Sequence, residues 1–561
     1  MSKTHGTRIC GAGIFTGFGE RHYNSGSTLE SLLIMVSRKI RLSCLIALSA
    51  PLFSLPLTAR AQPVWSGYGG NAQHTANSTV ASQSLQQIIW STAVDLNPQY
   101  SGSNLLVHYG SPLVTSNNTV IVPVKTGATD GFRVQAHNGA TGALLWQAAS
   151  DYSLPSHNWT PSYAPTLAPG GRLYMAGAGG TILYRDNVDT AAPTAPTRLA
   201  FYGDANYSAN QAAFNAGVKV CTPLTSDGNG NVYFGYRTEG ANPLGITSGL
   251  ARIAANGTVS FVTASTATGG NASQVVMNCA PAISNDGSKV YVTMSNGGFS
   301  GGYLVALNST TLATTASVRL KDAHTPGTDA ILADDGTASP MVAPDGKVFI
   351  GVLENPLVSS RGWTLQFNAD LTSSGVAGAF GWDITPTVVP RSMVSSYTGS
   401  SNYLLMTKYN NYFGFGGGDG INKLAILDPN DTFLDTRTNT IVMKEILTIA
   451  GVTPDPTLPQ VREWCINTAV LDPFTHSILA NSEDGKLYRW NLDSNTFTEV
   501  ITLTLGVGEA YTPTIIGGDG KVYAVNNATL FAVGNSSAPE PGTIALALLG
   551  MGVLIGRRRR A

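Results

Sequence analysis

The stretch "SPMVAPDGKVFIG" (residues 339–351) contains the pattern from which the fold can be predicted. A small residue and a proline precede a short apolar run, Asp-Gly interrupts that run, and a second run of alternating apolar residues follows. Asp-Gly between two such runs is a strong hairpin signal, because the turn needs a positive φ angle, which glycine adopts without strain and aspartate tolerates. A proline just before a strand removes no ladder hydrogen bond, so it marks where each unit begins. The stretch therefore predicts an antiparallel hairpin.

Related stretches recur along the chain. The same order of apolar run, turn and second apolar run occurs in "ISNDGSKVYV" (283–292), "LANSEDGKLYRW" (479–490) and "IIGGDGKVYAV" (515–525). The unit starts lie about 57 residues apart on average, at Pro112, Pro165, Pro223, Pro281, Pro340, Pro386, a degenerate start at Ala469, and Pro513. Three or four antiparallel strands repeated at this spacing are typical of the blades of a β-propeller, in which neighbouring sheets bury each other's faces.

The repeats predict an all-β propeller of about eight four-stranded blades. Seven blades is the alternative, because the interval from Pro386 to Ala469 is long and its end is weakly marked; an insertion at 397–420 would account for the excess. The last unit (512–534) supplies only three strands, and "LQQIIWSTAVDL" (85–96) supplies one more. Pairing of these two segments would close the ring and remove two exposed edges.

The composition limits the classes of partner. The chain has 561 residues, 43% of them hydrophobic, and only 12% of them charged, about half of the roughly 25% usual in soluble domains. Lys plus Arg (33) nearly balances Asp plus Glu (34), for a formal charge of -1. Because the chain has no excess of basic residues to attract phosphate groups, we expect no nucleic-acid partner.

The N-terminal part predicts export. Basic residues at 38–41 precede an apolar run at 42–57, and the small residues Ala59 and Ala61 precede Gln62. This order is typical of a secretory signal peptide that is cleaved before Gln62.

The signal peptide is assigned to residues 35–61 because Met35 opens it at the expected distance. Residues 1–34 are then an upstream extension that arises from a misplaced start, with a genuine long leader as the alternative. Residues 62–535 are left as the propeller.

One unit resembles the quinoprotein family of propellers, whose cofactor is pyrroloquinoline quinone (PQQ). "AHNGATGALLWQ" (136–147) matches the family's repeat signature, with Asn138 in its acidic position. The segment "WSGYGGNAQHTANS" (65–78) resembles the opening of such propellers at Trp65, His74 and Thr75. The resemblance implies the fold over residues 65–534, in which the glycine of each repeat turns the chain and the tryptophan packs between blades. Fold alone is a poor guide to activity.

The residues that bind the cofactor in that family's enzymes have no counterparts in this chain. Those enzymes stack the quinone between a pair of adjacent cysteines and a tryptophan, and hold Ca²⁺ with Glu, Asn and Asp. The chain has no adjacent cysteine pair, and no acidic set matches the calcium ligands. We therefore expect neither PQQ nor calcium. Blade packing is the expected role of Trp363, Trp382, Trp464 and Trp490.

No other metal site is predicted either. No two histidines stand at a metal-ligand spacing. "DGNGN" (227–231) looks like the opening of a Ca²⁺-binding loop, but Thr238 occupies the place of the closing glutamate, so a hairpin turn is the expectation. The pair Asp334 and Asp335 is expected to form a solvated turn, because its sequence context is turn-like.

Two cysteines stand at equivalent places. Cys221 and Cys279 each come directly before a repeat start, so they should lie in adjacent blades near the axis. We predict a disulfide between them, with two buried free thiols as the alternative.

The C-terminus reads "APEPGTIALALLGMGVLIGRRRRA" (538–561). Its apolar run is shorter than the roughly 20 residues of a standard membrane-spanning helix. It predicts a short helix, halted by basic residues that stay on the cytoplasmic side. Those residues are Arg557, Arg558, Arg559 and Arg560.

The order of Pro539, Glu540 and Pro541, apolar run and arginines resembles the PEP-CTERM sorting signal, here assigned to residues 536–561. That resemblance implies recognition by an exosortase, which removes the tail and releases or re-anchors the protein. A plain membrane anchor is the alternative.

These observations favour an exported propeller at the cell envelope, cell surface or extracellular matrix. We expect it to bind a glycan or a surface protein through inter-blade loops, without catalysis, and no catalytic residue is assigned. The alternative is an enzyme, either a quinoprotein-type dehydrogenase or a polysaccharide-cleaving propeller. Paired carboxylates in one cleft would favour the second, and their spacing is set only in three dimensions.

Overall fold

The computed structural model describes residues 62–535 except 102–103, 106, 108, 129, 158–162, 192–194, 335, 337, 357–360, 415–417 and 507–510. These residues belong to a compact unit that spans Ala59–Ala561. The predicted upstream extension, the signal peptide with Ala59 and Ala61, and the sorting segment with its apolar helix lie outside the described residues.

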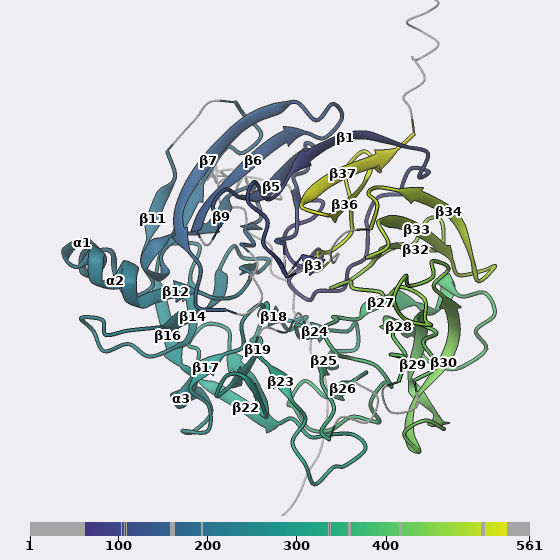
Figure 1. Cartoon of the computed structure of the whole chain (residues 1–561). Coiled ribbons are helices and arrows are strands. Elements are labelled where there is room, and N and C mark those ends of the chain that lie inside the picture. Colours follow the sequence, from purple (N-terminus) through teal and green to yellow (C-terminus); the bar gives the residue numbers. More distant parts are fainter. Residues whose placement is uncertain are drawn as a thin grey trace, which may run out of the picture. The chain divides into compact units, whose positions relative to one another are not determined.

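Eight antiparallel sheets follow one another around a common axis (Figure 1). Blade 1 contains β4 (Leu113–Val114), β5 (Thr119–Lys125), β6 (Asp130–Asn138) and β7 (Leu144–Ser153). Blade 2 contains β8 (Thr166–Leu167), β9 (Leu173–Ala176), β10 (Ile182–Arg185) and β11 (Thr197–Leu199). Blade 3 contains β12 (Val218–Val220), β13 (Thr225–Ser226), β14 (Val232–Thr238), β15 (Gly249–Ile253) and β16 (Val259–Thr263). Blade 4 contains β17 (Gln274–Val275), β18 (Ala282–Ile283), β19 (Lys289–Ser295), β21 (Gly302–Asn308) and β22 (Thr314–Arg319).

The second half of the ring continues in the same way. Blade 5 contains β24 (Met341–Val342), β25 (Val348–Val352) and β26 (Trp363–Phe367). Blade 6 contains β27 (Thr387–Pro390), β28 (Tyr403–Tyr409), β29 (Lys423–Asp435) and β30 (Thr440–Ala450). Blade 7 contains β31 (Val470–Asp472), β32 (Ser477–Asn481), β33 (Lys486–Asn491) and β34 (Thr496–Thr502). Blade 8 contains β35 (Ile515–Ile516), β36 (Val522–Asn526), β37 (Thr529–Gly534) and, from the other end of the chain, β1 (Gln87–Ala93).

The remaining elements lie in connections between strands. Strand β2 (Tyr100–Ser101) forms a small hairpin with β3 (Asn104–Leu105), and β20 (Phe299–Ser300) pairs with β23 (Leu332–Ala333), which follows it after two intervening strands. The helices are η1 (Ala178–Gly180), α1 (Asp204–Ala209), α2 (Gln211–Gly217), α3 (Ala264–Ala267) and η2 (Arg391–Met393). Among the residues that the structure describes, none of these helices has the length and apolarity to cross a bilayer.

Eight blades, and not seven, complete the ring, and its closure is as predicted. Strand β1 pairs antiparallel with β37, with Ile88 opposite Val533 and Thr92 opposite Leu530. The weak start at Ala469 does open a blade, since β31 begins one residue later. The range 397–420, predicted as an insertion, contains the regular strand β28. Much of the extra length of blade 6 lies instead in β29 and β30, of 13 and 11 residues.

In the recurring Asp-Gly turns the glycine and the aspartate have different roles. The sequence predicts the role of the glycine but not that of the aspartate. The glycines have positive φ angles, such as 85° at Gly346 and 83° at Gly520. The aspartates do not share this conformation. Instead, Asp345 Oδ1 accepts a hydrogen bond from the backbone N–H of Lys347 (3.1 Å) and Asp484 Oδ1 accepts one from Lys486 (3.0 Å). The aspartate therefore braces the turn that the glycine makes sterically possible.

Repeated side chains join neighbouring blades. The tyrosine of the Val-Tyr strand donates to a carbonyl of the next blade, from Tyr233 to Ser309 (2.9 Å) and from Tyr291 to Ala369 (3.0 Å). In the signature unit, Trp146 Nε1 of blade 1 donates to the Val188 carbonyl beyond β10 of blade 2 (2.7 Å). The predicted packing of this tryptophan between blades is therefore confirmed.

The segment from Val64 to Gln83 winds around the axis inside the ring. Carbonyl groups of this segment accept hydrogen bonds from the innermost strands of six blades, at distances of 2.7 to 3.1 Å. The donors are Val114, Leu167, Ile283, Val342, Val388 and Leu471. An innermost strand has no further strand beside it, so these N–H groups would otherwise lack partners. We call residues 62–83 the axial segment.

His74, one of the three residues that resemble the opening of quinoprotein propellers, is fully buried in the axial segment. Its Nδ1 lies 2.7 Å from the Pro340 carbonyl oxygen, and its ring meets Tyr68 edge-on, with 5.2 Å between ring centroids. Burial lowers the pKa of His74 to about 4, so the imidazole is neutral at physiological pH. The residue is part of the packing around the axis.

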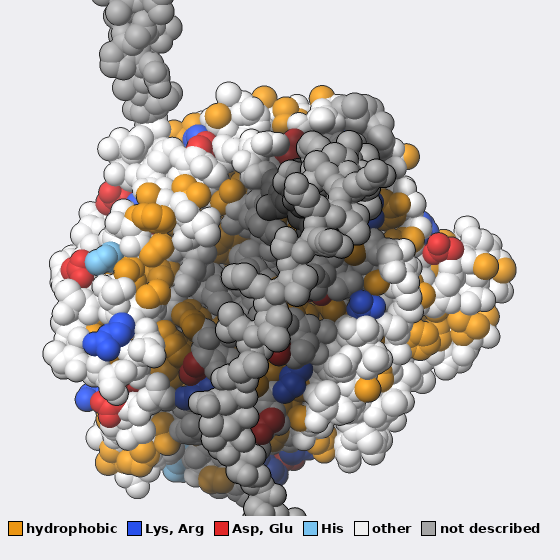
Figure 2. Space-filling view, turned by 180° about the vertical axis from the view of Figure 1, so that it is seen from behind, with side chains coloured by type: hydrophobic (Ala, Val, Ile, Leu, Met, Phe, Trp, Pro, Cys, Tyr) orange, Lys and Arg blue, Asp and Glu red, His pale blue; other side chains and the backbone are white. Residues whose placement is uncertain are grey.

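One face of the molecule is seen in Figure 2, where charged side chains of both signs are scattered singly among uncharged ones. This agrees with the charged fraction of 12%. No single-sign field marks the part of this face that the structure describes.

Candidate functional site

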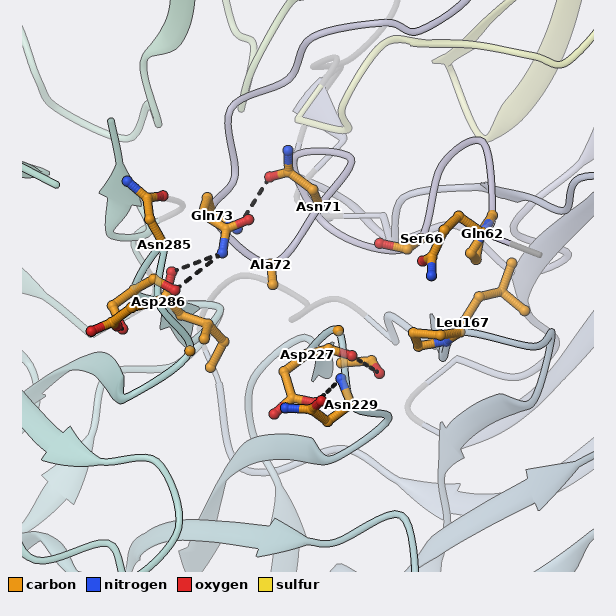
Figure 3. A pocket seen from close by; sticks show the side chains of 17 residues that line it. Gln62, Ser66, Asn71, Ala72, Gln73, Leu167, Asp227, Asn229, Asn285 and Asp286 are labelled. Atoms are coloured by element: carbon orange, nitrogen blue, oxygen red, sulfur yellow. Dashed lines mark hydrogen bonds between the residues drawn. The ribbon is translucent and has the colours of Figure 1, made fainter. Parts of the chain in front are cut away.

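A polar pocket of about 390 Å³ lies where the axial segment passes the first turns of blades 2, 3 and 4 (Figure 3). We call it the turn-face pocket. Its wall consists of Gln62 to Gln73 on one side and, on the other, the turns that follow β8, β13 and β18. Gln62, the first residue of the predicted mature chain, is one of the lining residues.

The blade 3 turn contributes Asp227 and Asn229. Asp227 Oδ1 accepts hydrogen bonds from the backbone N–H groups of Asn229 and Asn231, both at 2.9 Å, and its Oδ2 accepts from Asn231 Nδ2 (2.6 Å). The carboxylate is thus committed to the turn, so the expectation of a hairpin turn here is confirmed. The exposed Asn229 side chain makes no hydrogen bond to any described residue, and Figure 3 shows it at the pocket.

The axial segment is fastened at the pocket by amide groups. Asn71 Oδ1 accepts hydrogen bonds from the backbone N–H groups of Gln73 (3.1 Å) and Thr75 (3.2 Å). Gln73 Nε2 donates to the carbonyl of Ile283 in blade 4 (3.2 Å). These contacts hold one wall of the pocket against the ring.

The blade 4 turn brings a permanent negative charge. Asp286 Oδ1 accepts hydrogen bonds from Ser284 Oγ (2.6 Å) and from the backbone N–H of Ser288 (3.0 Å). These hydrogen bonds lower the pKa of Asp286 to about 2. The carboxyl group therefore stays ionised and is a poor general base or acid at neutral pH.

A second group of interest lies toward the opposite end of the axis. It consists of Asp383, Lys408, Glu463, Cys465 and Glu483, which we call the axial carboxyl cluster. Asp383 and Cys465 each come shortly before the innermost strand of a blade, whereas the turn-face pocket follows such strands. Cys465 Sγ lies 3.3 Å from Glu483 Oε2 and 4.0 Å from Glu463 Oε2.

Charge is poorly compensated within this cluster. Lys408 pairs with Asp383, which also accepts a hydrogen bond from the Tyr511 hydroxyl (2.9 Å). Glu463 donates its backbone N–H to Glu483 Oε1 (3.0 Å), but the nearest cation to Glu483 is Arg462, at 3.9 Å. Burial, reinforced by the neighbouring Glu483, raises the pKa of Glu463 to about 8. Burial also raises the pKa of Glu483. A carboxyl group held protonated near neutral pH can serve as a proton donor.

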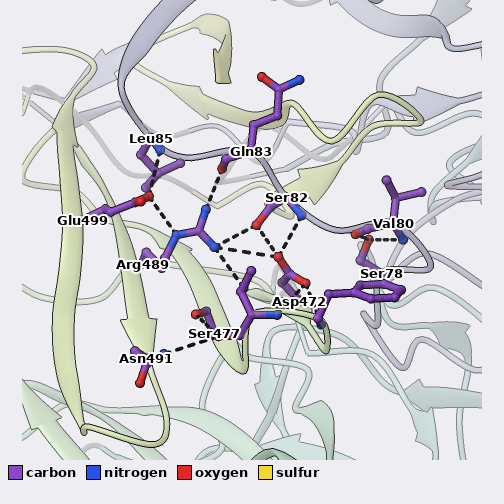
Figure 4. Close-up of polar contacts among 12 residues, drawn as sticks. Ser78, Val80, Ser82, Gln83, Leu85, Asp472, Ser477, Arg489, Asn491 and Glu499 are labelled. Carbon is purple, nitrogen blue, oxygen red and sulfur yellow. Dashed lines mark hydrogen bonds and ion pairs between the residues drawn. The ribbon is translucent and has the colours of Figure 1, made fainter. Parts of the chain in front are cut away.

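A third group fastens the chain end that closes the ring (Figure 4). Arg489 donates from Nε to Glu499 Oε2 (2.8 Å), from Nη1 to Ser82 Oγ (2.8 Å) and from Nη2 to the Gln83 carbonyl (2.6 Å). Asp472 Oδ2 accepts a hydrogen bond from the Ser82 backbone N–H (2.8 Å). These residues of blade 7 and of the axial segment, which we call the closure cluster, hold the chain just before it enters β1.

The cysteines predicted to pair are free and buried. Cys221 lies between β12 and β13, and Cys279 lies between β17 and β18, so their places in adjacent blades are equivalent. Cys279 Sγ accepts a hydrogen bond from Thr293 Oγ1 (2.8 Å). Burial raises the pKa of Cys221 to about 12 and that of Cys279 to about 11, which keeps both as thiols. The disulfide predicted between them is not formed in this structure.

The four tryptophans singled out in the sequence are largely buried between strands. Trp363 Nε1 donates to Asp322 Oδ2 (2.9 Å), and Trp490 Nε1 donates to Asn495 Oδ1 (3.0 Å). Trp464 packs edge-on against Tyr488, at 5.3 Å between ring centroids. Trp382 packs on the core of the ring as a partly buried side chain.

Asp334 departs from its prediction. It was expected in a solvated turn, yet its carboxylate pairs with Arg237, whose Nη1 donates to Oδ2 at 2.8 Å. Gln274 Nε2 donates to the same oxygen (3.1 Å). The pair forms because the connection after β23 passes the end of β14, a proximity across blades that local sequence does not encode. Asp335 lies outside the described residues.

The expectation that the chain binds neither PQQ nor calcium remains a prediction. Within the described ranges, no group of three or more His, Cys, Asp or Glu side chains is arranged to hold a metal ion. The sequence also has no adjacent cysteines to cover a quinone. We therefore derive no step through such a cofactor.

The comparisons with known proteins identify the sorting motif in the tail and find solved structures that are similar to the body. Residues 537–560 match the family model of the PEP-CTERM protein-sorting motif. No curated protein matches the chain. The quinohemoprotein alcohol dehydrogenase from Comamonas testosteroni is similar in structure at 12% identity and a TM-score of 0.49, over 86% of this chain and 82% of that one.

Two further solved structures are similar to the body. A europium-containing methanol dehydrogenase aligns at 11% identity and a TM-score of 0.49, over 82% of this chain and 88% of that one. BamB from Moraxella catarrhalis aligns at 11% identity and a TM-score of 0.40, over 81% of this chain and 99% of that one. At such identities the likeness says nothing about activity.

The match at residues 537–560 contains Pro539, Glu540, Pro541 and the four arginines of the predicted signal. Such a motif implies export, sorting to the cell surface and processing by an exosortase. The chain therefore carries a PEP-CTERM protein-sorting motif after an eight-bladed β-propeller.

Proposed function

We propose that the protein is a binding module of the cell surface or extracellular matrix, without catalysis of its own. In this proposal the signal peptide at 35–61 directs export, and an exosortase-type enzyme removes the tail. The propeller then presents a glycan- or protein-binding site. The membrane holds the protein through its C-terminal segment until processing.

The observation that carries the binding role is the chemistry of the turn-face pocket. Five carboxamide and three hydroxyl side chains line it, as in sites that recognise a ligand by hydrogen bonds. The two aspartates that line it are engaged in turns, and Asp286 stays ionised. In the lining the Ser284 hydroxyl donates to Asp286, but that carboxylate is a poor general base because its pKa is about 2.

The sorting part of the proposal is tested by replacing Glu540 with alanine in a cell that contains an exosortase. We expect the wild-type protein to lose its tail, as read by mass spectrometry of the intact chain, and to leave the inner-membrane fraction. The Glu540→Ala variant should keep the tail and stay in that fraction. An unprocessed wild-type chain in such a cell would contradict the proposal.

The axial carboxyl cluster favours a second candidate, a polysaccharide-cleaving enzyme. Glu463 and Glu483 both reach Cys465, so two carboxyl groups share one site, and one has a pKa of about 8. Glycoside hydrolases use such a pair, with a protonated carboxyl group as the general acid and a second carboxylate as the base or nucleophile. Release of reducing ends from a polysaccharide, abolished by Glu463→Gln, would establish this candidate over the binding role.

A further inference from the structure

The turn-face pocket continues into a second pocket along the same face of the ring. The second pocket has a volume of about 410 Å³, and Arg172, Tyr174 and Asp186 of blade 2 are among its lining residues. Pro169 lines both pockets, and the blade 3 turn contributes to both, through Asn229 in one and Gly230 in the other. Each pocket alone falls within the range of about 300–1,000 Å³ that small-molecule sites occupy. Together they outline a groove that suits an extended ligand better than a single small molecule.

The groups that remain available in the groove can both donate and accept hydrogen bonds. The Asn229 amide has no partner among the described residues. Asn285 Nδ2 donates to the Ala343 carbonyl (2.8 Å), and Gln73 Nε2 donates to the Ile283 carbonyl, which leaves the amide oxygens of both side chains as acceptors. A carboxamide presents an acceptor and two donors, which complements a hydroxyl group, itself both donor and acceptor.

The charges of the groove disfavour an anionic ligand. Asp286 is ionised, because its pKa is about 2. Arg172, the cation of the second pocket, is bound in a two-pronged pair with Asp186, at 2.7 and 2.9 Å, and lies 4.2 Å from the centre of the Tyr184 ring. With that cation neutralised, the described lining offers no positive charge to a uronate or sulfate group.

We propose that this groove binds a neutral polysaccharide, with several sugar units lying from the axial segment across the turns of blades 3 and 2. The inference rests on the proposed binding function and names its ligand class. It also shifts the expected site, because the groove is built from turns within blades and the axial segment, whereas the sequence predicted inter-blade loops.

Gly228 gives a clean way to block the groove. Its backbone does not have a positive φ, and a Cβ placed on it meets no atom within 4 Å, so a side chain can be added at the wall of the turn-face pocket without a clash at its Cβ. Gly327 has the same two properties and lies outside both pockets. Gly228→Trp and Gly327→Trp are therefore a matched pair of variants.

The experiment titrates the full-length chain in detergent with neutral hexose oligomers (cellohexaose, maltohexaose and laminarihexaose) and with oligogalacturonate as the acidic probe, by calorimetry. We expect at least one neutral oligomer to bind and oligogalacturonate to bind at least tenfold more weakly. Gly228→Trp should weaken the binding of the neutral oligomer at least tenfold, and Gly327→Trp should leave it unchanged.

A second, gentler variant keeps the test decisive if Gly228→Trp fails to fold. Asn229→Ala should weaken binding roughly three- to tenfold, as expected for loss of one or two hydrogen bonds. Gln86→Ala, which also removes an exposed amide, should have no effect.

Three results would overturn the inference: no neutral oligomer binds, oligogalacturonate binds as well or better, or neither Gly228→Trp nor Asn229→Ala weakens binding. Tail processing is read by mass spectrometry and does not depend on sugars, so failure of this inference remains distinct from failure of the proposed sorting.

Discussion

Ionisable groups of blade 7 take part in two clusters whose charges are compensated to different extents. In the closure cluster, Arg489 is 5% exposed, and every one of its nitrogens donates to a partner. In the axial carboxyl cluster, the carboxyl groups of Glu463 and Glu483 share the Cys465 thiol, and Glu483 also accepts the backbone N–H of Glu463. The local lysine, Lys408, is paired with Asp383.

This difference distinguishes ionisable groups that stabilise the fold from ionisable groups that lower its stability. A buried charge is tolerated when its partners replace the lost water, as around Arg489. A carboxyl group with a raised pKa costs stability whenever it must ionise, and such costs concentrate at functional sites. We therefore interpret the closure cluster as structural and the axial carboxyl cluster as the group that could take part in proton transfer.

The largest expected effect comes from breaking the closure cluster. Arg489→Ala leaves the carboxylates of Asp472 and Glu499 without their cation, so we expect a loss of about 3–5 kcal/mol in the free energy of unfolding, measured with urea. Arg172→Ala is the control, because its pair with Asp186 is largely exposed and should contribute at most about 1 kcal/mol. Equal losses for the two variants would show that closure does not depend on Arg489.

The axial carboxyl cluster should make stability fall as the pH rises. Because the pKa of Glu463 is raised to about 8 in the folded chain, the stability that its neutral form contributes is complete below the ordinary pKa of glutamate and is lost as the pH rises toward 8. One such group changes stability by at most about 1.4 kcal/mol per pH unit, and less here because the side chain keeps some contact with solvent. Glu463→Gln should flatten the stability profile between pH 5 and 8. An unchanged profile would contradict the raised pKa.

The closure cluster should show the opposite sign with a smaller amplitude. The hydrogen bonds from the Leu85 backbone and Arg489, together with the charge of Arg489, lower the pKa of Glu499 against the opposing effect of burial. Its contribution is therefore present above the ordinary pKa of glutamate and is lost as the pH falls through the lowered value. Glu499→Gln should reduce the loss of stability on the acid side of the profile and leave its alkaline side as in the wild type. A Glu499→Gln profile that matches that of Glu463→Gln would remove the distinction between the clusters.

The sequence predicts the ring because its repeats are local. A proline start, an Asp-Gly turn and a Val-Tyr strand lie within some 15 residues of one another, so a blade can be recognised from a short stretch of sequence. The orphan strand at the N-terminus and the short last unit were enough to predict the pairing of β1 with β37.

The sites were harder to predict because they depend on contacts between distant residues. The axial segment holds its place through backbone carbonyls, which carry no residue signature. Glu463 and Glu483 meet only because the chain turns back between β31 and β32. The sequence predicts Asp227 as a turn residue, but its neighbour Asn229 becomes a pocket residue only because the axial segment passes beside it.

Hydrogen exchange of the segment 62–93 is the sharpest test of ring closure, because this segment both closes the ring and forms a wall of the groove. We expect the amides of β1 (Gln87–Ala93) that are hydrogen-bonded to β37 to exchange as slowly as those of β36 and β37, with slow exchange also at the blade amides that donate to the axial segment. Fast exchange throughout 62–93, at the rate of an unpaired chain end, would contradict it.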